Sequence, residues 1–431
     1  MNTLFFLLVF YFIFLPFQFA LSPFTGVDLA VIRLFTIGIF FFWLAISLIR
    51  KRIFVPKPLL FFFPLSFLFV ISLSFFWAEQ SIYVLRKGAF LFSFFPLFFV
   101  LLSVILENPG IRQRLVSAYL AGATLLASCA LILFSTQFLF GIDQVLVFLT
   151  RTIFPIFLGD TFAQAVATYP SLLVNLSGAT ALRATGPFPD PHMFAFYLGL
   201  SFPIALLSLF SAKSQKWQVL YGGATVLVFL ALLLSFSRGA YAGLFLAGTI
   251  FLMQVKIKDW SKKKKWMTAL ILLLLFGGAV WSGAGARFLS SFSEKDGSNQ
   301  ERLRLWSEAV GHITERPFLG VGLGNYPFLV DPRASYRDPI YAHSLYLDIA
   351  VELGLLGLLA FLGLLFLALF SSWRLWQSEN NKQAQAVFLA LVIFSGHSLF
   401  ETALFSVHVL PALLLFLALG VSYKYEKNPV A

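Results

Sequence analysis

The sequence predicts an all-α polytopic integral membrane protein with about twelve transmembrane helices, and three observations support this. Hydrophobic residues make up 59% of the 431 residues and charged residues only 12%, against roughly half and a quarter in soluble domains. Phe alone occurs 55 times. Apolar runs of about 20 residues, the length that crosses the hydrocarbon core, recur along the chain. A soluble fold has too little interior for this much apolar side chain.

Runs that match a membrane-spanning helix begin near the first residue and continue almost to the last. No basic residue precedes the first run, and it is long for a signal peptide, so a span is favoured there over a cleaved signal. The predicted spans lie near residues 3–21, 29–49, 58–77, 88–106, 115–138, 192–211, 218–236, 239–255, 267–285, 344–371, 385–402 and 404–422.

Two longer segments separate the spans on the side that we expect to face outward. Residues 139–191 have an apolar middle, 145–157, which we expect to lie along the interface. Residues 286–343, between the ninth and tenth spans, form the most polar part, with a predicted helix over 299–312. Its apolar face carries Leu303, Trp306, Ala309 and Val310, and its polar face carries Glu301, Arg304 and Glu308. Because repeats and low-complexity linkers do not occur in the sequence, residues 1–431 are predicted to form a single membrane domain.

The positions of Lys and Arg predict the orientation, because cytoplasmic loops are enriched in them. Six basic islands hold 18 of the 31 Lys and Arg residues. All six fall on one side if twelve spans place both termini in the cytoplasm. The strongest anchor is the run of four lysines at 262–265, which we interpret as a charge cluster at the lipid headgroups.

The remaining 13 basic residues lie on or near the outer side, and 11 of them are Arg. The cytoplasmic set instead holds 13 Lys and 5 Arg. Topology does not require this change of residue type. Arg presents a planar, permanently charged fork that fits phosphate oxygens, whereas Lys is a hydrated point charge. The outer face is therefore predicted to hold a phosphorylated or carboxylated ligand.

Several classes of site are excluded by what the sequence lacks. The net charge of +12 does not indicate nucleic-acid binding, because the charges lie in short islands between apolar runs. The single cysteine, Cys129, allows no intrachain disulfide. No close-spaced His/carboxylate triad predicts a metal site, and no glycine-rich nucleotide motif is present. We therefore expect neither a metal nor any other cofactor, and no ATP.

The most informative motif is His343-Ser344, followed after nine residues by Gly354-Leu-Leu-Gly357. His343 precedes a predicted span at its outer end, where a histidine can accept a proton near neutral pH as a general base. A helix-capping or interfacial histidine without chemistry is the alternative. The two glycines, one turn apart, are expected to let a neighbouring helix approach closely.

Arginines at the outer ends of spans are candidates for anion binding. Arg183 and Arg238 each lie where an outer segment meets a helix, and Arg302 and Arg304 lie on the predicted outer helix. A guanidinium beside backbone N–H groups at a helix start can hold an anion. The alternatives are snorkelling to lipid phosphates for the first two and simple solvation for the loop arginines.

Four further polar residues are candidates for supporting roles near this outer end. Asp190 and His192 follow Arg183 at the start of a span. His397 and Glu401 are four residues apart near the outer end of the eleventh span, so we expect them on one helical face.

Four of these stretches resemble the O-antigen ligase and polymerase superfamily of bacterial membrane glycosyltransferases. They are RATGPFPDPH (183–192), SRG (237–239), ERLRLWSEAVGHITERPFLGVGLGN (301–325) and AHSLYLDIAVELGLLG (342–357). The His–Ser–x9–Gly–x–x–Gly pattern is associated with the ligase branch, which is therefore favoured. An Arg-x3-Leu pattern also associated with ligases is absent, whereas Arg183-x15-Gly199 and Arg304-x15-Gly320 match a polymerase pattern.

The resemblance implies a chemistry and a location. The donor would be a glycan on undecaprenyl diphosphate, and the acceptor a hydroxyl of lipid A–core, or another lipid-linked repeat in a polymerase. His343 would be the catalytic base, and Arg183, Arg238, Arg302 and Arg304 would hold the diphosphate, with Asp190, His192, His397 and Glu401 in support. The site would face the periplasm from the inner membrane, among membrane lipids.

Two alternatives remain open. A protein O-oligosaccharyltransferase would transfer the same donor to Ser or Thr. A transporter of the lipid-linked glycan would share the spans and buried arginines, but it would be expected to have two related halves. This chain instead has one large outer loop after its ninth predicted span.

Overall fold

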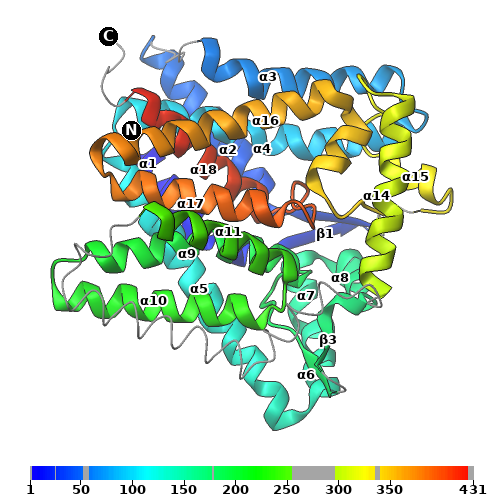
Figure 1. The fold of residues 1–431 in the computed structure, drawn as a ribbon, viewed down its shortest axis with the longest axis horizontal. Coiled ribbons are helices and arrows are strands. Elements are labelled where there is room, and N and C mark those ends of the chain that lie inside the picture. Colours follow the sequence, from blue (N-terminus) through cyan, green and yellow to red (C-terminus); the bar gives the residue numbers. More distant parts are fainter. Residues whose placement is uncertain are drawn as a thin grey trace.

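The computed structural model describes residues 2–24, 26–51, 58–176, 179–254, 297–334 and 340–425. The predicted ninth span at 267–285 and the four lysines at 262–265 lie outside these residues. The described part is a bundle of apolar helices with short elements gathered at one end (Figure 1). Among the described helices, six are long and apolar enough to cross a membrane, and three shorter apolar helices accompany them. The fold class is therefore confirmed as a largely helical membrane protein.

Each bundle helix overlaps one predicted span, although several boundaries differ. The bundle helices are α1 (Asn2–Phe14), α2 (Val31–Ile49), α3 (Pro58–Leu73), α4 (Ser81–Glu107), α5 (Ile111–Phe140), α9 (Pro191–Ser211), α10 (Gln215–Leu234), α11 (Arg238–Gln254), α16 (Leu345–Glu379), α17 (Lys382–His397) and α18 (Val409–Ser422). The boundaries differ most clearly at the start of α4, at the end of α16 and near the ends of the chain. The first predicted span is too long, because α1 gives way to a 3-10 turn (Leu15–Phe17) that contains Pro16. The last two predicted spans are also too long, because α17 ends at His397 and α18 begins only at Val409.

The short elements lie at the end of the bundle opposite the two chain termini (Figure 1). Two antiparallel hairpins, which were not predicted, pair β1 (Ala20–Phe24) with β2 (Val27–Ala30) and β3 (Leu173–Leu176) with β4 (Ala179–Leu182). Between them in the chain lie α6 (Ile142–Phe148), a π-helical turn (Leu149–Ile153), α7 (Phe154–Leu158) and α8 (Asp160–Ala167), which pack around their own small apolar cluster. Glycines at positive φ mark two of the junctions: Gly141 separates α5 from α6, and Gly159 separates α7 from α8.

The predicted outer helix is present as α14 (Gly297–Glu315), and a short helix, α15 (Tyr326–Val330), follows it. In Figure 1, α14 stands across the end of the bundle, and it packs against α16. The prediction of its apolar face was wrong by about one residue. Leu303 and Val310 are exposed, whereas Leu305 and Ala309 are buried. The inward face also carries Arg302, whose guanidinium pairs with Glu401.

Helix α17 lies at the centre of the bundle. Helix α9 packs against α10 and α17, and α17 also packs against α11, α16 and α18. The N-terminal ends of α9, α11 and α16 and the C-terminal end of α17 are thereby brought together, although they lie far apart in the sequence.

Candidate active site

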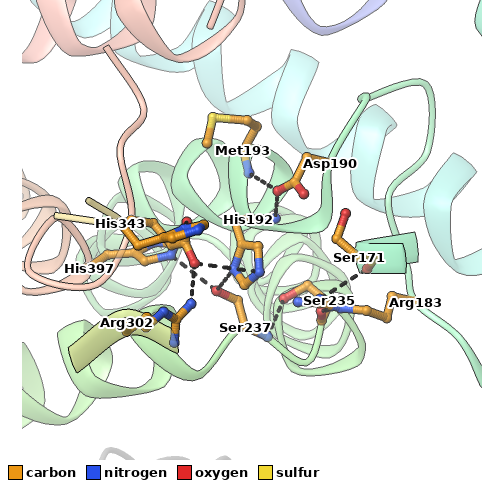
Figure 2. Close-up of polar contacts among 11 residues, drawn as sticks. Ser171, Arg183, Asp190, His192, Met193, Ser235, Ser237, Arg302, His343 and His397 are labelled. Atoms are coloured by element: carbon orange, nitrogen blue, oxygen red, sulfur yellow. Dashed lines mark hydrogen bonds and ion pairs between the residues drawn. The ribbon is translucent and has the colours of Figure 1, made fainter. Parts of the chain in front are cut away.

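A cluster of polar side chains occupies the point where these helix ends meet (Figure 2). It is built from His192 in the first turn of α9, Ser237 directly before α11, Arg302 on α14, His343 before α16, His397 at the end of α17 and Glu401 in the segment after α17. The sequence predicted Glu401 on the same helical face as His397. That prediction was wrong, because α17 ends at His397 and the chain turns before Glu401. Both side chains nevertheless reach the cluster.

The carboxylate of Glu401 is the centre of the cluster. Its Oε2 lies 3.1 Å from Nδ1 of His343, and its Oε1 accepts a hydrogen bond from Nη2 of Arg302 and lies 3.7 Å from Nε2 of His192. Burial disfavours the charged form, but the surrounding histidines and the guanidinium outweigh it and hold the pKa of Glu401 well below its usual range. Glu401 is therefore an ionised, acceptor-only group.

This ionised carboxylate determines the form of His343. Because a carboxylate only accepts, Nδ1 of His343 carries the proton that it donates to Glu401, and in the neutral ring Nε2 keeps its lone pair. Burial alone lowers the pKa of His343, but the charge and hydrogen bond of Glu401 raise it above its ordinary value. The His343 side chain is 42% exposed and that of Glu401 only 9%. A partly exposed imidazole is thus paired with a buried anion.

Helix α14 covers the cluster through two side chains. Arg302, 15% exposed, bonds Glu401, and the indole N–H of Trp306 donates to the carbonyl oxygen of Ala342 at 2.8 Å. Ala342 directly precedes His343. The outer helix is therefore attached to both segments that carry the histidine–carboxylate pair.

Behind Glu401, a serine joins two histidines. The hydroxyl of Ser237 lies 2.9 Å from Nδ1 of His192 and 3.0 Å from Nε2 of His397, whose ring stacks on Phe196 at 3.6 Å between centroids. One arrangement of protons satisfies these contacts. His397 donates to Ser237, Ser237 donates to His192, and the Nε2–H of His192 points toward Glu401. His192 is itself fixed at the start of α9, where Asp190 caps the helix by accepting from the backbone N–H of His192 at 2.6 Å.

The predicted arginines take different positions. Arg183 does not lie at a helix start but directly after β4. Its guanidinium donates to the main-chain carbonyls of Ser235 at 2.6 Å and Ser171 at 3.0 Å (Figure 2). It thereby fixes the turn that carries Ser237. Arg238 is the first residue of α11 and is buried.

Arg304 is not part of the cluster. Its side chain is 51% exposed and pairs with Glu301 and Glu308 on its own helix. Of the two outer-helix arginines singled out in the sequence, only Arg302 faces the site, because residues two apart on a helix point in different directions.

The interpretation of the two glycines needs correction. Gly354 has φ 64° and ψ −172° and interrupts α16, and what approaches it is a loop rather than a helix. A Cβ on Gly354 would overlap the carbonyl of Phe318, whereas one on Gly357 would meet Leu353 of its own helix. The loop and the interrupted helix exchange main-chain hydrogen bonds, from Val321 N to Val351 O at 2.9 Å and from Leu355 N to Pro317 O at 2.8 Å. Gly354 therefore allows the segment after α14 to dock on α16.

Sequence reasoning missed three buried charges. Lys87 of α4 pairs with Glu352 of α16 at 2.9 Å, and Asp348 lies one turn before Glu352. Asp348 and Glu352 are charged residues inside a largely apolar run, which is a signal of function or tight structural pairing in membrane helices. Their partners could not be identified from the sequence because they come from other elements.

The fold and the cluster together define a class: a helical membrane protein with a histidine–carboxylate pair beneath an outer helix. Residues 223–362 match the family model described as O-antigen ligase. A protein of Rickettsia conorii, whose name provisionally describes it as a polysaccharide ligase, is 27% identical over 179 residues, which are 38% of this chain and 41% of that protein. The chain thus aligns with about two fifths of the length of this relative.

These matches confirm the resemblance to the O-antigen ligase superfamily that the motifs predicted. The matched region contains Arg238, Arg302, His343 and Gly354. His192, His397 and Glu401 lie outside it and join the site only through the fold.

Proposed function

We propose that this protein is an O-antigen ligase-type glycosyltransferase that moves a glycan from undecaprenyl diphosphate to a hydroxyl of lipid A–core at the periplasmic face of the inner membrane. The observation that carries the proposal is the pairing of accessible His343 with buried Glu401 beneath Arg302. The name of the Rickettsia relative, a polysaccharide ligase, agrees with this substrate class.

In the proposed reaction, Nε2 of His343 removes the proton of the acceptor hydroxyl. The hydroxyl oxygen attacks the anomeric carbon of the first sugar with inversion, and the bond from that carbon to the diphosphate oxygen breaks. Undecaprenyl diphosphate leaves with the bonding electrons. Glu401 acts as a positioning residue, because it holds the ring with Nε2 outward and stabilises the imidazolium that forms, as a carboxylate does for a general-base histidine.

The leaving diphosphate requires positive charge, and the arginines supply it in the proposal. Arg302 and Arg238 are the best placed, because one faces the pair and the other begins α11 next to Ser237. Arg183 supports the same turn through its two carbonyl contacts. Preorganised charges of this kind stabilise a developing anion. The diphosphate linkage itself stores the driving force, so the reaction requires no ATP.

A polymerase, in which the acceptor is another lipid-linked repeat, is the second candidate. The Arg183-x15-Gly199 and Arg304-x15-Gly320 patterns favour it. The chemistry at His343 would be the same, and only the acceptor would differ.

The primary test is the His343→Ala variant, expressed in a strain that lacks this gene. We expect it to reach the membrane in normal amount and to lose glycan transfer. Normal transfer would remove the base assignment.

The lipopolysaccharide of the deletion strain then identifies the acceptor. Bare core with polymer of normal length on the carrier supports the ligase, and core that bears a single repeat supports the polymerase. Unchanged lipopolysaccharide would contradict both and indicate another glycan or a protein acceptor.

A further inference from the structure

We propose that Asp348, buried in the first turn of α16, is a positioning residue that holds His343 and Glu401 at their working separation. One carboxylate oxygen, Oδ1, accepts from the backbone N–H of Ala342 at 2.8 Å, and the other, Oδ2, accepts from the hydroxyl of Thr402. Ala342 is the residue before His343, and Thr402 is the residue after Glu401. A single side chain therefore ties together the two segments that carry the pair.

We call these two hydrogen bonds of Asp348 the clamp. The backbone of His343 gives an independent reason for it. Its φ is 49°, in the left-handed region that residues other than glycine seldom adopt. A conformation of this kind is strained and persists only where the surroundings impose it. The Asp348–Ala342 hydrogen bond acts on the adjoining peptide. Without it, we expect the segment to relax and turn the imidazole away from Glu401.

The other contacts between the two segments do not replace the clamp. The backbone N–H of Leu345 donates to the carbonyl of Ser398 at 2.9 Å, and the hydroxyl of Tyr346 donates to the carbonyl of Ser395 at 3.0 Å. These bonds join the start of α16 to the end of α17. Beyond the helix ends, where His343 and Glu401 lie, Asp348 links the two segments directly, whereas α14 reaches them through separate side chains, Arg302 and Trp306.

Asp348 and its buried neighbour Glu352 have different partners. Glu352 is paired with Lys87 on α4 and so joins α16 to a different helix. The two acidic residues are one turn apart but serve different segments, and only Asp348 is attached to the site.

The experiment uses a pair of variants that do not change the charge. Thr402→Val keeps the size and removes the hydroxyl donor, whereas Thr402→Ser retains the donor. The titration of His343 is followed by NMR of histidine-labelled full-length protein in lipid nanodiscs, and His343→Gln identifies its signal among the five histidines. Glu401, Arg302, Asp348 and Glu301 are the charged groups that act on this ring.

If Thr402 and Asp348 align His343 with Glu401, Thr402→Val moves the titration midpoint of His343 to lower pH, because Glu401 is then less well placed. In Thr402→Ser the titration midpoint of His343 stays at the wild-type value. Asp348→Ala shifts it further than Asp348→Asn, since asparagine retains an acceptor for Ala342. In transfer assays, Asp348→Ala lowers kcat by roughly 10²-fold, the cost of a displacement near 1 Å, and leaves KM unchanged.

An unchanged midpoint in Thr402→Val, together with equal shifts in the two Asp348 variants, would overturn the proposal, because Asp348 would then act through its charge alone. The inference rests on the proposed function, but the NMR measurement does not require transfer. If the midpoint shifts as expected while wild-type protein transfers no glycan, the clamp stands and the proposed function fails.

Discussion

Nδ1 of His343 lies 3.1 Å from Oε2 of Glu401, although 58 positions separate the two residues in the chain. The contact joins the segment before α16 to the segment after α17, and the packing of α16 against α17 brings these segments close to each other. It orients the imidazole of His343 and raises the pKa of this side chain above its ordinary value.

Glu401→Gln tests this contact. Glutamine preserves the size but removes the charge, so we expect kcat to fall by at least about 10²-fold, as for loss of an orienting carboxylate. The pH profile gives a second measure. Because Glu401 raises the pKa of His343, wild-type activity is lost as pH falls through that raised pKa, when Nε2 becomes protonated. In Glu401→Gln the pKa falls, so the acidic limb moves to lower pH.

The control for this variant is His312→Gln, which removes a histidine on α14 that pairs only with Glu315 among its described ion pairs. The acidic limb of its pH–activity profile is expected to match that of the wild-type protein. An unmoved limb in Glu401→Gln would show that another group controls the profile.

Arg302→Lys and Arg304→Lys form a matched pair on the same helix. Arg302 faces Glu401, whereas Arg304 is half exposed and bonds its own helix. We expect Arg302→Lys to lower kcat/KM at least about tenfold, because lysine lacks the planar fork, and Arg304→Lys to stay within about twofold, as for other exposed pairs. Transfer from a lipid-diphosphate donor in proteoliposomes measures both. Equal effects would contradict the placement of α14.

Arg238→Lys keeps the charge at the start of α11 and removes the fork. A large loss of transfer is expected if this side chain holds the diphosphate. Near-normal activity in the same proteoliposome assay would mean that Arg238 is structural or bonds lipid headgroups.

Gly354→Ala tests the docking of the outer loop. Alanine is strained at φ 64° and ψ −172°, at a cost of roughly 1–3 kcal/mol, and its Cβ would displace Phe318. We expect a lower melting temperature, faster proteolysis of the 316–334 segment and loss of transfer. Gly248→Ala is the control, because a Cβ there meets nothing within 4 Å. Similar behaviour of the two variants would argue against the docked loop.

Transfer in excess EDTA should continue at the wild-type rate, since the proposed mechanism neutralises the diphosphate with arginine side chains. The measurement compares initial rates with and without EDTA and after adding Mg²⁺. Loss of activity that Mg²⁺ restores would refute this part of the mechanism.

Hydropathy alone determined where most of the long helices of this protein lie in the sequence. A run of about 20 apolar residues has one favourable place, across the bilayer, whatever its neighbours are. The predicted spans at 192–211 and 239–255 therefore match α9 and α11 to within a residue or two. The His343 motif also indicated the family and the candidate base, because these depend on local spacing.

The tertiary structure decided which residues act together. Whether Arg302 or Arg304 faces the site depends on the rotation of α14 against α16, and whether Glu401 meets His343 depends on where α17 ends and how the chain then turns. Asp348 acquires its two partners only when the segments on either side of it converge. Side-chain reach is a few ångströms, so contacts of this kind are set by the packing of distant helices, which local periodicity does not encode.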